Sequence, residues 1–314
     1  MFSTDSFFIE AIFLATGIAG VWVGADSAVA GASLLARKLK VNPVIAGLTV
    51  IAVGTSLPEI FVCLTAAFKG SADIATGNIV GSNISNIGLI AGISAVLAPI
   101  SVRQGLRAET AAAIAGLGLL LFLCADGTLG RAEGFYVIAA VAPLTAYLYV
   151  RQAGKTGEEI PEEIASGAGA VLVTIAAGLA ALGLGSSLLV ESAVSIAHRA
   201  EVPEVVIGAT AVAVGTSLPE LAASVAAVSR REHSIAVGNI AGSNLFNIII
   251  LGLTSSIVPL SVDSEVPGFQ LPVAIGLTAL TLPFMKKGAT AGRTAGAVLL
   301  LIYGAFLYRV FAGS

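Results

Sequence analysis

Residues 54–59 read GTSLPE, and residues 215–220 read GTSLPE again, 161 positions later. Both copies stand in stretches that are otherwise almost wholly apolar. Of the 314 residues, 56% are hydrophobic and only 11% are charged, whereas a soluble domain carries about 25% charged residues. A soluble surface cannot be built from this composition, which predicts an integral membrane protein. The net charge of −3 gives no reason to expect a nucleic acid as partner.

Stretches of about 20 apolar residues predict membrane-spanning helices. At that length the sequence predicts an all-α integral membrane protein with ten transmembrane helices near 7–36, 43–68, 73–98, 105–124, 131–150, 167–197, 204–229, 233–258, 268–285 and 292–312. A polar segment, 152–166, is expected to be a cytoplasmic linker between a first half, 1–151, and a second half, 167–314.

Lysine and arginine predict the orientation in the membrane. On this topology one face collects four of them, Lys69, Arg131, Arg199 and Arg309. The other face collects twelve, namely Arg37, Lys38, Lys40, Arg103, Arg107, Arg151, Lys155, Arg230, Arg231, Lys286, Lys287 and Arg293. The excess predicts that the set of twelve is cytoplasmic and that both termini are extracytoplasmic. We therefore expect a multi-pass protein of the cell inner or plasma membrane.

The repeated hexapeptide belongs to a longer internal repeat. GLTVIAVGTSLPE (47–59) matches GATAVAVGTSLPE (208–220), and GNIVGSNISNI (77–87) matches GNIAGSNLFNI (238–248) at the same offset. Each predicted half holds five spans, an odd number, so the second copy enters the membrane from the opposite side. Two inverted five-helix repeats are typical of transporters that work by alternating access.

The chemistry of the hexapeptide explains its place in a membrane helix. Pro58 cannot donate an N–H to the carbonyl of Gly54, so the helix is expected to kink or break there. Freed carbonyls at membrane depth are tolerated only where they face protein, water or an ion. Thr55 and Ser56 lie near the face of Glu59 on a helix. Span 43–68 therefore offers a carboxylate, two hydroxyls and loosened carbonyls, and the second copy offers the same groups through Thr216, Ser217, Pro219 and Glu220.

The second polar block adds hydroxyls and amides. Ser82 and Asn86 are four residues apart and share one face of a helix, as do Ser243 and Asn247. Four more asparagines face either an ion or the broken backbone of a neighbouring helix, and the sequence leaves both interpretations open: Asn78, Asn83, Asn239 and Asn244.

Electrostatics favours an ionic role for the two glutamates. An ionised carboxylate at the centre of a bilayer costs at least about 3 kcal/mol. The four spans that carry the repeat contain no lysine or arginine, so the counter-charge must be a proton or a bound cation. Carboxylate, carbonyl and hydroxyl oxygens without histidine or cysteine favour Ca²⁺ or Na⁺ over zinc or copper.

The paired GTSLPE and GN-x-x-GSN blocks resemble the two α-repeats of the sodium/calcium exchanger family, within the wider calcium/cation antiporter superfamily. The resemblance is close over residues 42–92 and 203–253 and covers the rest of the chain loosely. It implies a central cluster of ion sites at which entering Na⁺ drives Ca²⁺ out. No cofactor and no protein partner are implied beyond the transported ions and the lipid bilayer.

Carried over by position, the resemblance implies that Glu59 and Glu220 hold Ca²⁺ together with the carbonyls of Thr55 and Thr216. Sodium would use the same glutamates together with Ser82, Ser243 and the carbonyls of Ala52 and Ala213. Asn86 and Asn247 would lie near the middle, supported by Ser56, Ser217, Pro58 and Pro219.

Two points of the resemblance concern other positions. Archaeal-type members of the family can carry aspartate where this chain has Asn247, so one titratable group is absent here. Spans 7–36 and 167–197 resemble the long gating helices of the family, and each contains one acidic residue, Asp26 and Glu191. These two could guide ions along an entry path or pair with Arg37 and Arg199 at the periphery.

The sequence thus predicts a secondary Na⁺/Ca²⁺ antiporter and not an enzyme, since no nucleophile triad, metal-hydrolase motif or phosphate loop accompanies the glutamates. A Ca²⁺/H⁺ antiporter and a potassium-dependent exchanger stay open as alternatives. A cation channel is a further alternative, against which the inverted repeat argues.

Overall fold

The computed structural model describes residues 4–102, 105–154, 167–199 and 215–313. Within these ranges the chain is almost entirely helical, as the sequence predicts. Up to residue 154 the helices are α1 (Thr4–Lys38), α2 (Pro43–Ala46), the π-helical η1 (Gly47–Ile51), α3 (Ala52–Thr55), α4 (Leu57–Phe68), α5 (Ala72–Ser85), the π-helical η2 (Asn86–Ala91), α6 (Gly92–Leu97), α7 (Arg107–Leu123) and α8 (Arg131–Ala153).

From residue 167 onward the described helices are α9 (Ala168–Arg199), α11 (Leu218–Ser229), α12 (His233–Ile257), the π-helical η3 (Val266–Gln270), α13 (Leu271–Thr281) and α14 (Arg293–Gly313). Their ends follow local chemistry. The side chain of Asn42, for example, accepts a hydrogen bond from the N–H of Val44 at 3.0 Å, and Pro43 occupies the first turn of α2.

Six described helical stretches are long and apolar enough to cross a membrane: Ile9–Lys38, Ala72–Leu97, Arg131–Ala153, Ala168–Arg199, His233–Ile257 and Arg293–Val310. A seventh results if Pro43–Thr55 and Leu57–Phe68, bent by 42°, form one broken span. Three expected spans are shorter than predicted or begin outside the described residues: α7 has 17 residues, Val266–Thr281 is a shorter apolar helix, and the span at 204–229 is described only from residue 215.

The first broken span confirms the break that Pro58 predicts. Helix α3 ends at Thr55, and α4 begins at Leu57 after the single residue Ser56. The carbonyl of Gly54 has no N–H to accept from Pro58, so the turn opens at this point. The hexapeptide therefore lies at a bend inside the membrane protein and not within a continuous helix.

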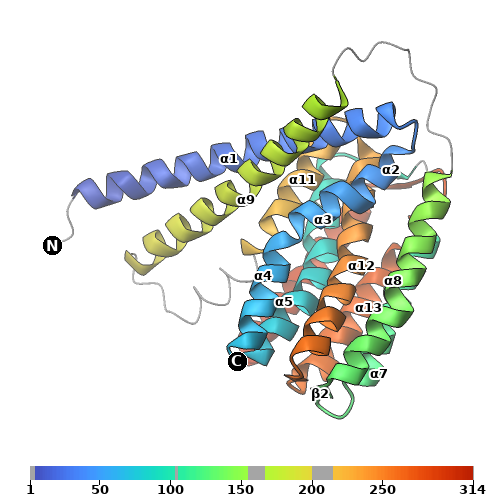
Figure 1. The fold of residues 1–314 in the computed structure, drawn as a ribbon. Coiled ribbons are helices and arrows are strands. Elements are labelled where there is room, and N and C mark those ends of the chain that lie inside the picture. The colour runs from blue at the N-terminus through green and yellow to red at the C-terminus, as the bar shows by residue number, and fades with distance from the viewer. Residues whose placement is uncertain (1–3, 103–104, 155–166, 200–214, 314) are drawn as a thin grey trace.

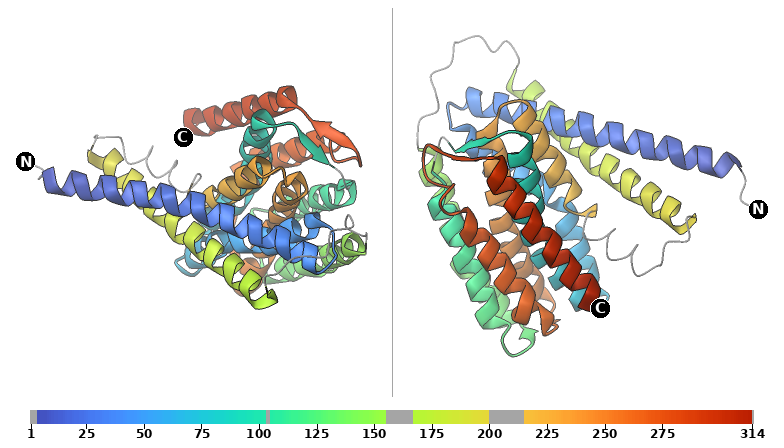
Figure 2. Two further views of the ribbon diagram at one scale, coloured as in Figure 1. Left: turned by 90° about the horizontal axis from the view of Figure 1, so that it is seen from above. Right: turned by 180° about the vertical axis from the view of Figure 1, so that it is seen from behind.

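Helices α1 and α9 form a pair that crosses one face of the bundle and extends beyond it at one end (Figures 1 and 2). Glycines bring their backbones into direct contact. A Cβ at Gly24 of α1 would lie 2.7 Å from the Cα of Leu182, and one at Gly20 would lie 3.1 Å from the Cα of Gly185. Small residues at such a crossing allow close packing of membrane helices.

Ion pairs fasten the α1–α9 pair differently at its two ends. Near one end Arg199 of α9 pairs with Glu10 of α1 at 2.9 Å, so this contact lies within the pair. Toward the other end of α1, Asp26 accepts a hydrogen bond from Nη2 of Arg230 at 2.6 Å, and Arg37 pairs with Glu232 at 3.2 Å. Those contacts join α1 to the connection between α11 and α12.

Helix α12 lies in the middle of the bundle and packs closely against the first broken span (Figure 1). A Cβ at Gly242 of α12 would lie 2.6 Å from the carbonyl oxygen of Leu48 in η1. On α5, Gly77 and Gly81 have no such neighbour among the described residues. The 161-residue offset predicts that segment 204–214 packs against Gly77 and Gly81, and this segment lies outside the described residues.

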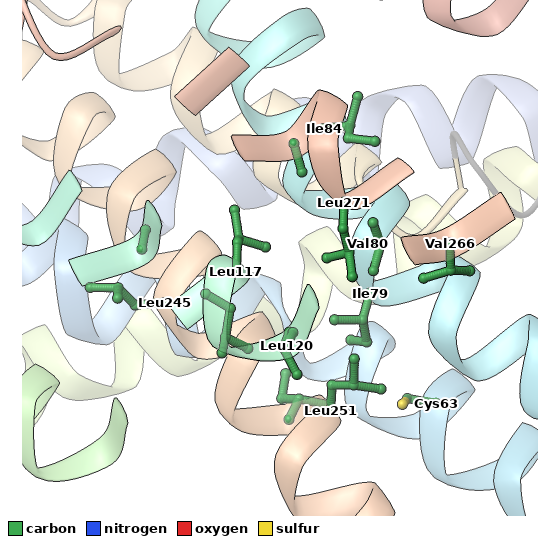
Figure 3. Close-up of a cluster of buried hydrophobic side chains, with 14 of the residues drawn as sticks. Cys63, Ile79, Val80, Ile84, Leu117, Leu120, Leu245, Leu251, Val266 and Leu271 are labelled. Atoms are coloured by element: carbon green, nitrogen blue, oxygen red, sulfur yellow. The ribbon is translucent and has the colours of Figure 1, made fainter. Parts of the chain in front are cut away.

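The main apolar core lies where α4, α5, α7, α12 and α13 meet (Figure 3). Its fully buried side chains include Ile79, Val80 and Ile84 of α5 together with Leu117 and Leu120 of α7. Side chains of α12 and α13 complete it, with Leu245, Leu251 and Leu271. This cluster holds α5 and α12, the two helices that carry the GN-x-x-GSN blocks.

Four short strands, which the sequence does not predict, join the two parts of the chain. Strand β1 (Ile100–Val102) pairs antiparallel with β4 (Ala289–Ala291), and β2 (Thr128–Leu129) pairs antiparallel with β3 (Leu260–Ser261). In each pair one strand precedes residue 154 and the other follows residue 215. Each strand pair therefore joins the part of the chain before residue 154 to the part after residue 215.

Basic residues of the same predicted face meet in two places. The N–H of Leu106 donates to the carbonyl of Met285 at 2.9 Å, next to Arg107 and Lys286, and Arg37 pairs with Glu232, which directly follows Arg231. All four basic residues belong to the set of twelve expected on one face of the membrane. The structure thus brings together members of that set that are far apart in sequence.

The close packing at Gly24 leads to a first prediction. Gly24→Leu should lower the free energy of unfolding by about 1–3 kcal/mol, because the larger side chain must separate α1 from α9. Thermal unfolding of the detergent-solubilised protein measures the change. Gly183→Leu on α9 is the matched control, because a Cβ there has no neighbour within 4 Å in the part of the chain that the structure describes. An equal loss in both variants would contradict the close crossing.

Candidate cation-binding site

Both copies of GTSLPE form the same backbone turn. Ser56 has φ −84° and ψ 8°, and Ser217 has φ −85° and ψ 0°. Each serine directly precedes a helix that carries proline in its first turn, where the missing N–H has no helical partner to lose. The turns place Glu59 and Glu220 in the first turns of α4 and α11.

The two carboxylates are buried side chains that interact with each other electrostatically. Glu59 is 1% exposed and Glu220 is 2% exposed. The hydroxyl of Ser56 donates to Oε1 of Glu220 at 2.9 Å. The Oε2 atoms of both glutamates are buried without a hydrogen-bond partner among the described residues. Glu220 therefore has one oxygen held in place, and each carboxylate has one oxygen available as a ligand.

The described helices that form this site hold no basic side chain to balance the two carboxylates. These helices, residues 43–68, 72–97, 218–229 and 233–257, contain no lysine or arginine. A buried charge that lacks its ion-pair partner costs about 3–5 kcal/mol. The arrangement therefore favours a proton or a bound cation as the counter-charge.

Hydroxyl groups join the two copies across the site. The hydroxyls of Ser56 and Ser243 are hydrogen-bonded at 3.3 Å, and those of Ser217 and Ser82 at 3.5 Å. The second bond is the first one shifted by 161 residues at both ends. All four serines are at most 4% exposed. The serines predicted as site residues are thus brought together, and Ser56 contacts Glu220.

Two of the four undecided asparagines satisfy the broken backbone. The Nδ2 of Asn78 donates to the carbonyl of Glu59 at 3.4 Å, and that of Asn239 donates to the carbonyl of Glu220 at 3.3 Å. Asn83 bonds within its own helix, to the carbonyl of Ile79 at 2.9 Å. The backbone alternative is therefore correct for Asn78 and Asn239, and Asn83 fits neither alternative.

The central amides offer further oxygens. Asn86 and Asn247 are each 1% exposed. The Nδ2 of Asn86 donates to Oδ1 of Asn244 at 3.0 Å, which leaves Oδ1 of Asn86 without a partner among the described residues. Asn247 has no hydrogen-bond partner for either Nδ2 or Oδ1 among the described residues. The unpartnered oxygens of the two amides are uncharged, unlike the Oε2 atoms of the two glutamates.

Of the four residues whose carbonyls the resemblance implies as ligands, the structure describes three. Ala52 is fully buried, and its carbonyl accepts from the N–H of Ser56 at 3.1 Å and from the hydroxyl of Thr55 at 3.4 Å. Thr55 and Thr216 are 1% and 8% exposed, directly before the two turns. Ala213 lies outside the described residues.

The two acidic residues of the long helices lie away from the glutamates. Asp26 pairs with Arg230 and not with Arg37, because Arg37 pairs with Glu232. Glu191 is exposed on α9, while Arg199 pairs with Glu10. The peripheral alternative therefore describes Asp26 correctly, although its partner differs from the one expected.

The donor set of the site consists of oxygen atoms only. Two carboxylates, serine hydroxyls and asparagine amides converge from α4, α5, α11 and α12, and no group of three His, Cys, Asp or Glu side chains suited to a metal occurs in the described ranges. Hard oxygen donors of mixed charge suit Ca²⁺ and Na⁺, whereas zinc prefers nitrogen and sulfur.

Sequence reasoning missed the partners that these groups find in the other part of the chain. Asn78 accepts a hydrogen bond from the hydroxyl of Thr216 at 3.1 Å. Asn239 accepts one from Thr55 at 3.4 Å and donates to Ser224 at 3.0 Å. The identical offset of these residues in the repeat was the available signal, since it relates Asn78 to Asn239 and Thr55 to Thr216.

Comparison with known proteins gives a consistent result. A family model described as sodium/calcium exchanger protein matches residues 9–150 and 170–312. The sodium/calcium exchanger MaX1 of Methanosarcina acetivorans is 32% identical over 345 residues, which cover 96% of this chain and 99% of that protein. The inner membrane protein YrbG of Escherichia coli is 34% identical over 317 residues, which cover 94% of this chain and 95% of that protein.

A solved structure has the same fold. The sodium-calcium exchanger NCX_Mj, soaked with zero Na⁺ and Ca²⁺, superposes with a TM-score of 0.85 at 29% sequence identity. The match covers 96% of this chain and 99% of that one.

The unbalanced carboxylates lead to a prediction about stability. Calcium should raise the melting temperature of the purified protein over its value in a chelator, since a ligand at 100 times its dissociation constant stabilises by about 2.7 kcal/mol. Glu59→Gln and Glu220→Gln should each lose most of this shift. Glu109→Gln is the matched control: Glu109 is also 2% exposed, on α7, and has an unpartnered Oε2. A shift that survives in Glu59→Gln and Glu220→Gln would remove these glutamates from the site.

Proposed function

Because the chain belongs to the sodium/calcium exchanger family, we propose that it is a secondary antiporter that exchanges Na⁺ for Ca²⁺ across the membrane by alternating access. The observation that carries this proposal is the pair of buried carboxylates, Glu59 and Glu220, without a basic partner in the helices around them. Proteins of this family are transporters and not enzymes.

The proposed ligands are those that the resemblance to the family implies. Ca²⁺ is bound by Glu59 and Glu220 with the carbonyls of Thr55 and Thr216, and one Ca²⁺ balances the two carboxylates. Na⁺ uses the same carboxylates with Ser82, Ser243 and the carbonyls of Ala52 and Ala213. At the carbonyl of Ala52, Na⁺ takes the place of the hydroxyl of Thr55, whose single proton can go to Asn239 instead. The amides of Asn86 and Asn247 are proposed to lie near the middle of the site.

Competition for shared ligands makes the process an exchange. Since both ions need Glu59 and Glu220, they cannot occupy the site together. An empty site carries two unbalanced charges, which makes its transfer between the two sides of the membrane costly. Loading with either ion removes that cost, so the transporter crosses loaded in both directions.

We further propose ten membrane spans arranged as two inverted five-helix repeats, 1–151 and 167–314, joined by the linker 152–166. Three hydrogen bonds of the site occur twice at the 161-residue offset: Thr216–Asn78 with Thr55–Asn239, Ser217–Ser82 with Ser56–Ser243, and Asn78–Glu59 with Asn239–Glu220. The two strand pairs, each with one strand from either repeat, support the same arrangement.

The moving part in this proposal is the α1–α9 pair. Its two helices interlock through glycines, and Arg199 and Glu10 join them at one end. A pair that is packed so closely moves as one body across the bundle, while the site stays in the broken turns of the core. The contacts of Asp26 and Arg37 with Arg230 and Glu232 then hold the pair to the core at one end.

Transport itself provides the decisive test. Proteoliposomes loaded with Na⁺ should accumulate ⁴⁵Ca²⁺ from a sodium-free medium, and uptake should stop when the Na⁺ gradient is collapsed. Glu59→Gln and Glu220→Gln should each reduce the initial rate at least about 100-fold, because both carboxylates are needed to balance Ca²⁺. Glu109→Gln should retain the wild-type rate.

The driving ion is settled in the same vesicles. Uptake driven by a pH gradient in the absence of Na⁺ would replace the proposal by Ca²⁺/H⁺ antiport, and a requirement for K⁺ would make the protein a potassium-dependent exchanger. Uptake by both glutamine variants at the wild-type rate would disprove the assignment of the site.

The proposed orientation has its own test. In a background without Cys63 and Cys124, Lys69→Cys should react with a membrane-impermeant maleimide on intact cells, because Lys69 is proposed to face the extracytoplasmic side. Lys286→Cys should react only after the membrane is permeabilised. The reverse pattern would invert the topology and place both termini in the cytoplasm. Fractionation tests the proposed inner or plasma membrane location.

A further inference from the structure

Two buried asparagines connect the two copies of the site. Asn78 of α5 donates from Nδ2 to the carbonyl of Glu59, in its own part of the chain, and accepts at Oδ1 from the hydroxyl of Thr216 in the other part. Asn239 of α12 makes the equivalent bonds with Glu220 and Thr55. Each amide therefore links the backbone of one glutamate to the threonine hydroxyl in the other copy of GTSLPE.

We propose that Asn78 and Asn239 are positioning residues that hold the two half-sites at the separation the cation requires, without binding the ion themselves. This inference rests on the proposed function and deepens it. Both polar atoms of each amide are already hydrogen-bonded to protein groups, Nδ2 to a carbonyl and Oδ1 to a hydroxyl. They therefore act on ion binding indirectly, by holding the backbone that carries the proposed ligands.

The chemistry of an amide suits this task. The carbonyl of Glu59 needs a donor and the hydroxyl of Thr216 needs an acceptor, and asparagine supplies both from one planar group. Aspartate lacks the donor, and leucine of similar size lacks both. Because Thr55 and Thr216 are the residues whose carbonyls are proposed as calcium ligands, fixing their side chains fixes the ligand positions.

The two asparagines are not held equally well. The Nδ2 of Asn239 has a second acceptor, the hydroxyl of Ser224, at 3.0 Å. At the 161-residue offset from Ser224 the chain carries Cys63. The Sγ of Cys63 contacts the hydroxyl of Thr254 at 3.3 Å and the carbonyl of Ala75 at 3.7 Å, not Asn78. Asn239 is therefore anchored by three groups and Asn78 by two.

Equilibrium ⁴⁵Ca²⁺ binding to the purified full-length protein tests the proposal without requiring transport. Asn78→Leu and Asn239→Leu should each weaken Ca²⁺ binding about tenfold, because each loses two or three hydrogen bonds that fix the ligand geometry. The melting temperature in a chelator reports structural damage separately from the loss of affinity.

Double-mutant cycles distinguish positioning from a general loss of packing. Thr216→Val removes the hydroxyl that Asn78 accepts from and leaves the backbone carbonyl in place. Its effect on Ca²⁺ affinity should be non-additive with Asn78→Leu, because both changes break the same bond. The same substitution combined with Asn239→Leu, which is not its partner, should be additive. Additive effects in both cycles would overturn the proposal.

A milder pair of variants keeps the test valid if an asparagine variant does not fold. Ser224→Ala should weaken Ca²⁺ binding about threefold by loosening Asn239, whereas Cys63→Ala at the equivalent position should leave the affinity unchanged. Equal affinities of wild type, Ser224→Ala and Cys63→Ala would overturn the positioning role while leaving the site intact. Failure of the wild-type protein to bind Ca²⁺ would instead overturn the proposed function and this inference with it.

Discussion

The structure depends on two carboxyl groups that are buried without a basic partner in the helices around them. Glu59 and Glu220 lie at the breaks of two helices, where proline prevents the backbone from closing its hydrogen bonds. A broken helix and a carboxylate are each unfavourable in an apolar interior. They occur together because the break supplies carbonyl oxygens and the carboxylate supplies charge, and a cation needs both. The surrounding helices α5 and α12 carry hydroxyls and amides for the same reason, since any uncharged apolar residue there would leave the broken turns unsatisfied.

The second constraint is that neither copy of the repeat forms a site alone. Ser56 reaches Glu220, Ser217 reaches Ser82, and the Thr216 hydroxyl reaches Asn78. Each hydrogen bond crosses between parts of the chain that are more than 130 residues apart. The apolar core around α5 and α12 and the two strand pairs hold these parts in register, so the polar groups meet without large rearrangement.

Local chemistry could be predicted from the sequence where one segment determines it. The break at Ser56, the burial of both glutamates and the gathering of Ser82 and Ser243 follow from proline, charge and helical spacing. Partners in other helices could not be predicted, because periodicity defines the face of a helix and not what lies opposite it. The same limit applies to the pairing of Asp26 with Arg230, and strands of two or three residues are too short to show alternation.

The neutrality of Asn86 and Asn247 has a consequence for energy conversion. With amides at both central positions, the charge of the site comes from Glu59 and Glu220 alone and is at most two. In the proposed exchange, one Ca²⁺ or two Na⁺ leave the two carboxylates without net charge, and any further Na⁺ would travel as an uncompensated charge. Each such charge couples to the membrane potential with about 2.3 kcal/mol per 100 mV. Under this proposal the voltage dependence of exchange reports how many sodium ions are bound, because no third carboxyl stands at these two positions to take up or release a proton.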